Sequence, residues 1–170
     1  MPAAPVAISV DEYLHTSFPD GDREYIDGVI VERNLGEKDH SRTQRELILF
    51  FGALRATHAT FAFPEQRVQV KPTRFRVPDV CVYIGSEPAE QVFRTPPFLV
   101  VEILSPDDRA TAVQEKIDDY LACGVQFIWI IDPRTRRGYI HAPEGSHEAK
   151  DSILRTANPA IDLPLHRLFD

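Results

Sequence analysis

The sequence predicts an α/β domain of the mixed α+β kind, in which a central mixed β-sheet is flanked by α-helices. Three observations predict this class. The chain has 170 residues and is 43% hydrophobic, which suits one globular domain over residues 1–170 with a substantial core. Several short apolar runs are typical of buried strands. Two long helical patterns lie between groups of strands, so a regular doubly wound sheet is not expected.

The chain begins with signals for a short helix and a hairpin. Residues 9–12 (Ser-Val-Asp-Glu) match a capping box, so we predict a short helix that ends near His15. Two strand-like segments, residues 24–26 and 29–33, flank Asp27-Gly28. An Asp-Gly pair between such segments is typical of the tight turn of a β-hairpin.

Two longer segments have the periodicity of amphipathic helices. The first covers about residues 39–56, and the second follows a turn at 105–108 and runs to about Cys123. Gly124 is placed to end the second helix in a left-handed conformation. The apolar stripes are Leu47, Phe50, Phe51 and Leu54 in the first helix and Val113, Ile117, Tyr120 and Leu121 in the second.

The other hydrophobic segments are typical of strands. The predicted strands are residues 61–71, 80–84, 98–104, 126–131 and 138–142, the last of them at a sheet edge. Residues 87–97 are expected to form a loop, and the tail to hold an extended piece near Ile153 and a turn at 165–169.

Composition excludes several classes of protein. No run approaches 18 apolar residues, so no transmembrane helix is expected, and the first residues lack the pattern of a secretory signal. The two cysteines, Cys81 and Cys123, form no disulfide framework or zinc spacing, and a reduced cytoplasmic location is expected. The net charge of −7 argues against tight binding of nucleic acid by a basic surface. It does not exclude an enzyme that contacts a phosphodiester through one local patch.

Two carboxylates stand where apolar residues are expected. Glu102 interrupts the strand at residues 98–104, and Asp79 precedes the strand at 80–84. A buried carboxylate is costly unless it is paired or bound to a metal. If the two strand ends are adjacent, a divalent cation would remove the repulsion between the carboxylates, and hard oxygen ligands favour Mg²⁺ or Mn²⁺. The alternatives are that Asp79 is a turn or cap residue and that Glu102 pairs with an arginine.

Three further side chains are candidates for the same site. Lys116 flanks the apolar face of its helix, from which Glu115 and Asp119 are expected to point away. It could reach Glu102 and stabilise negative charge on a phosphate, or simply extend to solvent. His40 continues the apolar stripe of the first long helix and is either a site residue or a packed or capping residue. Glu24 borders the hairpin turn, where glutamates are usually solvated.

These residues, in this order, resemble the Uma2 family of endonuclease-like proteins, which is grouped with the PD-(D/E)xK nucleases. The resemblance runs from about residue 12 to residue 169. It rests on five segments: Glu24 to Gly28, His40 at the start of its helix, Arg76 to Val80, Val100 to Pro106, and Lys116 with Tyr120, Gly124 and the later Trp129 to Pro133. It implies a restriction-endonuclease-like core with a central mixed sheet between helices.

The resemblance also implies an activity and a site. Asp79, Glu102 and the backbone carbonyl of Ile103 are expected to hold Mg²⁺ or Mn²⁺, with Lys116, His40 and Glu24 as further site residues. The usual lysine, two residues after the glutamate, would fall at Leu104, and Lys116 fits a variant in which the lysine moves to the next helix. The expected reaction is hydrolysis of phosphodiester bonds in nucleic acid, with DNA as the first choice.

Other functions and partners remain open at this point. The chain could be a non-catalytic member that binds nucleic acid or protein, or a hydrolase of another phosphate ester. A homodimer is expected. Arg42, Arg45, Lys71, Arg74, Arg76 and Arg109 could meet phosphate, but most are expected to be solvated surface residues.

Overall fold

The computed structural model describes residues 7–19, 21–34 and 36–170, and its centre is a six-stranded sheet. The strand order is β10-β9-β8-β7-β6-β3. Within it β7 and β8 pair in parallel and the other neighbours are antiparallel, so the predicted mixed sheet is confirmed. The strands are β3 (Thr60–Pro64), β6 (Val80–Ile84), β7 (Leu99–Ile103), β8 (Phe127–Asp132), β9 (Arg137–Ala142) and β10 (Gly145–Glu148).

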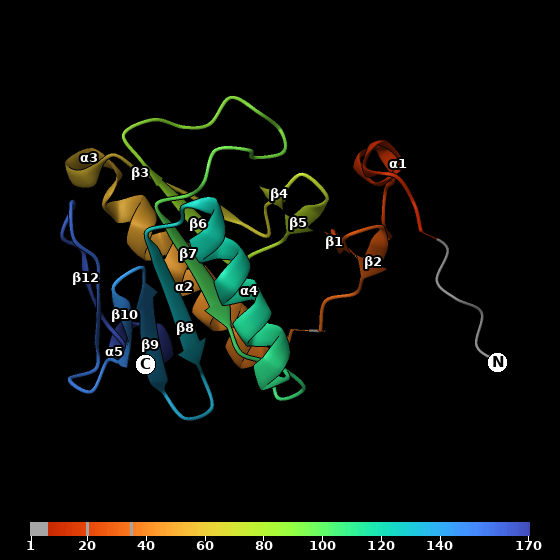
Figure 1. Ribbon diagram of the computed structural model, residues 1–170. Coiled ribbons are helices and arrows are strands. Elements are labelled where there is room, and N and C mark those ends of the chain that lie inside the picture. Colours follow the sequence, from red (N-terminus) through yellow and green to blue (C-terminus); the bar gives the residue numbers. More distant parts are fainter. Residues whose placement is uncertain (1–6, 20, 35) are drawn as a thin grey trace.

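Two helices cover the opposite faces of this sheet (Figure 1). Helix α2 (Lys38–Ala53) packs against the face that carries Val101, and α4 (Ala110–Cys123) packs against the face that carries Val100. Because successive residues of a strand point to opposite faces, Glu102 of β7 points to the same side as Val100. The strand therefore directs this carboxylate towards α4.

A smaller sheet lies to one side of the central one and carries the N-terminal helix (Figure 1). Its order is β2-β1-β5-β4, and its core holds the rings of Tyr13, Tyr25 and Phe75. Ser9 is confirmed as the N-cap, because the backbone N–H of Glu12 donates to Ser9 Oγ at the start of α1. The elements are α1 (Val10–His15), β1 (Glu24–Ile26), β2 (Val29–Val31), β4 (Val68–Lys71) and β5 (Arg74–Arg76).

Several predicted boundaries were wrong. Residues 61–71 are not one extended piece, because Glu65 adopts a left-handed conformation (φ 49°) and the chain passes from β3 into β4 of the other sheet. Strand β5 (Arg-Phe-Arg) has too few apolar residues to be recognised. The strand at 138–142 is not an edge strand, since the polar strand β10 pairs with its outer side.

The predicted first long helix divides into two. Helix α2 ends at Ala53, and the short helix α3 (Arg55–His58) follows it. Gly124 ends α4 with φ 106°, as predicted. The tail contains β11 (Ile153–Arg155), β12 (Asp162–Pro164) and the short helix α5 (His166–Phe169). Among the described residues, no helix is long and apolar enough to cross a membrane.

Candidate active site

The two carboxylates singled out in the sequence meet at one end of the central sheet. Strands β6 and β7 are antiparallel with Val80 opposite Val101, so Asp79, just before β6, and Glu102 lie at the same end of this strand pair. Both carboxylates are buried. The backbone N–H of Ile103 donates to Asp79 Oδ2 at 2.7 Å, which fixes Asp79 beside the end of β7.

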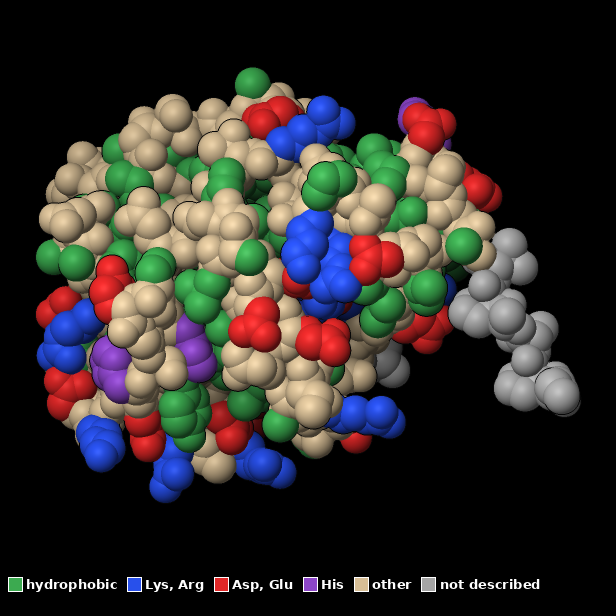
Figure 2. Space-filling view, in the orientation of Figure 1, with side chains coloured by type: hydrophobic (Ala, Val, Ile, Leu, Met, Phe, Trp, Pro, Cys, Tyr) green, Lys and Arg blue, Asp and Glu red, His purple; other side chains and the backbone are tan. Residues whose placement is uncertain are grey.

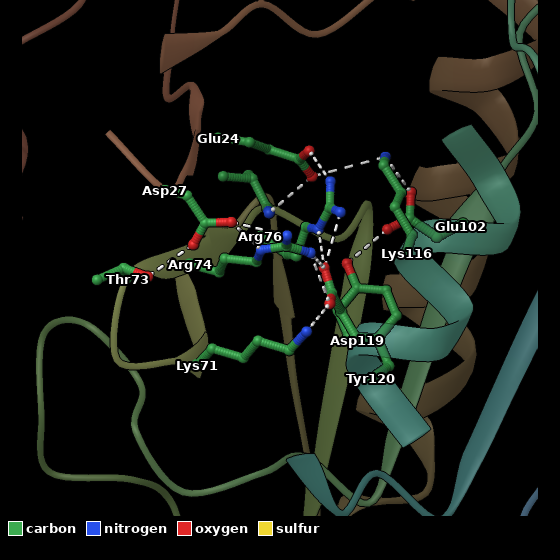
Figure 3. Close-up of polar contacts among 11 residues, drawn as sticks. Glu24, Asp27, Lys71, Thr73, Arg74, Arg76, Glu102, Lys116, Asp119 and Tyr120 are labelled. Carbon is green, nitrogen blue, oxygen red and sulfur yellow. Dashed lines mark hydrogen bonds and ion pairs between the residues drawn. The ribbon is translucent and has the colours of Figure 1, made fainter. Parts of the chain in front are cut away.

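Helix α4 supplies both partners of Glu102. Tyr120 donates its hydroxyl to Glu102 Oε1 at 2.7 Å, and Lys116 Nζ lies 3.1 Å from Glu102 Oε2 (Figure 3). Residues four apart on a helix share one face, so both side chains reach down to β7 together. Burial raises the pKa of Glu102, and the charge of Lys116 opposes this rise. Burial would lower the pKa of Lys116, but the charges of Glu102 and Glu24 raise it, so the lysine is a cation.

Glu24 is buried and belongs to this cluster, contrary to the expectation that a hairpin glutamate is solvated. Its Oε1 lies 3.6 Å from Lys116 Nζ and accepts from the backbone N–H of Val77 at 3.2 Å. Its Oε2 accepts from Arg76 Nη1 at 2.9 Å (Figure 3). The hairpin strand β1 pairs with β5, and this pairing brings Glu24 to the central sheet. Lys116 therefore sits between two carboxylates, one from each sheet.

A buried ion-pair network extends from Glu24 into the small sheet (Figure 3). The guanidinium of Arg76 also donates to Asp119 Oδ2 at 2.7 and 2.9 Å, and both side chains are buried. Two sequence expectations were wrong here, since Arg76 is not a solvated surface residue and Asp119 does not point away from the core. The expectation for Asp119 took into account only the face of the helix that packs on the central sheet. Asp119 instead faces β4 and β5, where Lys71 and Arg74 also contact it.

Asp79 has two cationic partners on its other oxygen. Arg33 Nη2 lies 2.8 Å and His40 Nε2 lies 3.2 Å from Asp79 Oδ1. The hydrogen bond with Asp79 raises the pKa of His40. Burial would raise the pKa of Asp79, but the hydrogen bond from His40 and the charges of His40 and Arg33 lower it, so Asp79 is a carboxylate.

Arg33 is a site residue that the sequence analysis missed. It follows β2, and the two-residue period places it on the same side as Val29 and Val31. All three side chains line the cleft described next. This alternation was the signal available in the sequence, but the hairpin was interpreted only as a turn with solvated flanks.

The cluster forms the floor of a cleft of about 760 Å³ between the β1–β2 hairpin and α4. Among the described residues that line it, acidic groups outnumber basic ones. The acidic residues are Glu24, Glu32, Asp79, Glu102, Asp107, Asp108 and Glu115, and the basic residues are Arg33, Arg76, Arg109 and Lys116, with His40 beside them. An anionic substrate would meet net negative charge in this cleft unless a cation also binds there.

The donor set fits a small hard cation. Asp79 and Glu102 offer carboxylate oxygens, and the Ile103 carbonyl points to the Asp79 side of β7, because the N–H and C=O of one strand residue face the same neighbour. Mg²⁺ commonly takes one or two carboxylates and completes its shell with water and substrate oxygens. In the part of the chain that the structure describes, no three His, Cys, Asp or Glu side chains form a complete metal cage.

The comparisons with known proteins agree with the fold. The model of the family described as "Uma2: Putative restriction endonuclease" matches residues 10–166. A crystal structure of a "putative nuclease belonging to DUF820 from Anabaena variabilis ATCC 29413" has a TM-score of 0.80 and 27% sequence identity, over 95% of this chain and 97% of the other. No curated protein matches. Since the family model covers nearly the whole length, the chain belongs to the Uma2 family.

Proposed function

We propose that this protein is a metal-dependent endonuclease that hydrolyses phosphodiester bonds of nucleic acid, with DNA as the preferred substrate. The observation that carries the proposal is the meeting of Asp79 and Glu102 at one sheet end, with Lys116 Nζ 3.1 Å from Glu102. The family description and the nuclease neighbour support the same class of function.

The site residues have different roles in this proposal. Asp79, Glu102 and the Ile103 carbonyl would hold Mg²⁺ or Mn²⁺, which supplies Lewis acidity at a phosphate oxygen and makes a bound water more acidic. Lys116, a cation held between Glu102 and Glu24, orients the attacking water and stabilises the charge that develops on the phosphorane-like transition state. His40 and Arg33 hold Asp79 ionised and in position.

Cleavage of supercoiled plasmid, linear duplex and single-stranded DNA in Mg²⁺ and in Mn²⁺ tests the proposal. Glu102→Gln keeps the shape of the side chain and removes its charge, so we expect cleavage to be lost. The matched control is Asp118→Asn, which neutralises an exposed carboxylate on α4 that accepts a hydrogen bond from Gln114, and this variant should leave cleavage unchanged. Equal cleavage by the wild type and Glu102→Gln would refute the assignment.

One observation favours a second candidate, a non-catalytic protein that binds nucleic acid or protein. Each carboxylate oxygen of Asp79 and Glu102 already accepts from a protein donor, as in a purely structural cluster. Titration of the wild type with Mn²⁺ separates the two candidates. Saturable binding that Glu102→Gln weakens favours the nuclease, and absence of both metal binding and cleavage favours the second candidate.

The expected homodimer and cytoplasmic location stay predictions. A mass by light scattering equal to that of one chain would exclude the dimer.

A further inference from the structure

A second hollow opens directly beside the catalytic cleft. It has a volume of about 700 Å³ and lies between the first turns of α4, the inner part of β8–β9 and the start of α2. Ser105, Asp108 and His40 line both this hollow and the cleft, so the two spaces are adjacent and share a wall. Nothing in the proposed hydrolysis uses the second hollow.

The hollow exists because α4 covers only part of its sheet face. Strand β9 pairs with β8 so that Tyr139 is opposite Ile130 and His141 is opposite Ile128, which places Tyr139 and His141 on the α4 face. Helix α4 lies over β7 and β8, and no described helix lies over β9 and β10 on this side (Figure 1). Tyr139 and His141 are therefore half-buried at the wall of an open pocket.

The lining suits a flat heteroaromatic group. Its apolar part comes from the sheet end and from α4, and comprises Leu104, Val113, Ile117 and Ile130. Burial lowers the pKa of His141, so at neutral pH its imidazole offers one hydrogen-bond donor and one acceptor. The Tyr139 ring adds a surface for stacking.

Two of the acidic side chains that line the hollow are held by hydrogen bonds. Asp132 accepts from the backbone N–H groups of Arg134 and Thr135 in the β8–β9 turn, and Asp108 accepts from Asn34 and from the backbone N–H of Ser105. Glu37 and Asp39 are the other acidic residues of the lining. Repulsion from these carboxylates disfavours a phosphate inside the hollow, whereas a neutral base meets no such repulsion. The rim carries Arg134 and Arg136. Basic side chains gather along the lower edge of this face, below β9 and α4 (Figure 2).

We propose that this hollow, the Tyr139 pocket, binds the unstacked base of the nucleotide next to the scissile phosphate. This inference rests on the proposed function, because the phosphate at Asp79 and Glu102 fixes where the neighbouring nucleoside lies. Ser105 and Asp108 lie between the cleft and the pocket, and Arg134 and Arg136 in the pocket lining are the cations nearest to a bound sugar-phosphate chain, Arg136 also pairing with Asp170 at 3.1 Å. A base in a stacked duplex cannot enter, so the substrate is a single strand or a locally opened duplex.

Fluorescence of an oligonucleotide that contains one 2-aminopurine tests the pocket without any cleavage. Binding is measured with the full chain in EDTA and in Ca²⁺. The base analogue becomes brighter when it leaves the stack, so the wild type should raise its emission. Tyr139→Leu should weaken binding by about tenfold, since stacking of one base carries that much affinity, and should abolish the rise in emission.

Two further variants separate a binding role from a structural one. Tyr139→Phe keeps the ring and should restore both affinity and emission. His166→Ala is the control for His141→Ala, because His166 is exposed on α5 and does not line the hollow. We expect His166→Ala to bind as the wild type does and His141→Ala to bind more weakly.

The outcomes distinguish failure of the pocket from failure of the nuclease proposal. Cleavage by the wild type together with unchanged binding by Tyr139→Leu, or with no binding of single strands in either buffer, would overturn the pocket and leave the nuclease. Ring-dependent binding without cleavage in any metal would support base binding in the pocket but overturn the nuclease, and with it the place of that base beside a scissile phosphate. Absence of both binding and cleavage would overturn both.

Discussion

Replacement of Arg76 by methionine should destabilise the fold far more than the same replacement of its neighbour Arg74. Arg76 is buried and bridges Glu24 and Asp119, so its removal leaves two buried carboxylates with weaker compensation. Removing one partner of a buried ion pair costs about 3–5 kcal/mol. The low end applies here, about 3 kcal/mol, because Asp119 keeps Lys71 and Arg74 and Glu24 keeps a backbone donor.

That loss corresponds to a fall in Tm of about 6–12 °C for a chain of this size. Arg74 is partly exposed, its partner Asp27 is exposed, and its second partner Asp119 would keep Arg76 and Lys71, so Arg74→Met should cost about 1 kcal/mol or less. Urea denaturation followed by circular dichroism measures both variants. In the double variant Arg76→Met/Asp119→Asn the losses should not add, since the second change removes a carboxylate that the first has left uncompensated. Equal free energies of unfolding for the Arg76 and Arg74 variants would refute the reasoning.

Further outcomes concern hydrogen bonding, packing and pH. Tyr120→Phe removes the buried hydroxyl that donates to Glu102 and should lower the free energy of unfolding in urea by about 2 kcal/mol. An unchanged urea midpoint would show that this hydrogen bond does not stabilise the fold. Gly138→Ala should cost about 1–3 kcal/mol, because its new Cβ would lie 2.9 Å from Leu154 Cδ2. Gly52→Ala, in an open position of α2, should instead stabilise the fold by about 0.5–1 kcal/mol. Thermal unfolding should therefore show a lower Tm for Gly138→Ala and a higher Tm for Gly52→Ala than for the wild type. The Arg76 hydrogen bond and neighbouring charges outweigh burial and lower the pKa of Asp119, so its stabilisation is present above about pH 4 and is lost as pH falls below that value. Asp119→Asn should therefore show a shallower loss of stability in acid.

Most strands of the central sheet could be predicted because each is recognisable from its own short segment of sequence. Apolar runs identified β6, β7 and β8, and helical periodicity identified α2 and α4. The small sheet was only half predicted. Its hairpin has a strong turn signal, whereas β5 is three residues with two arginines, and its place between β1 and β4 depends on partners distant in the sequence.

The candidate site divides in the same way. Asp79 and Glu102 were found because a carboxylate conflicts with an apolar strand, and such a conflict is visible in one segment. The burial of Glu24, Arg76 and Asp119 was not found, because each looks like a surface residue within its own element. Their mutual compensation appears only when the hairpin, β5 and α4 are brought together, and periodicity within one element carries no information about it.

The position of the lysine connects the two pockets. Glu102 and Leu104 are two residues apart and so point to the same face of the chain leaving β7. In this protein the lysine is Lys116 of α4, whose Nζ lies 3.1 Å from Glu102 Oε2, so position 104 does not have to carry a charge. Leu104 instead contributes an apolar wall to the Tyr139 pocket. A lysine at position 104 would place a cation in that wall beside the apolar side chains of α4. Supplying the lysine from α4 thus keeps the positive charge at the carboxylates and leaves the wall at position 104 apolar, which suits the face of a neutral base.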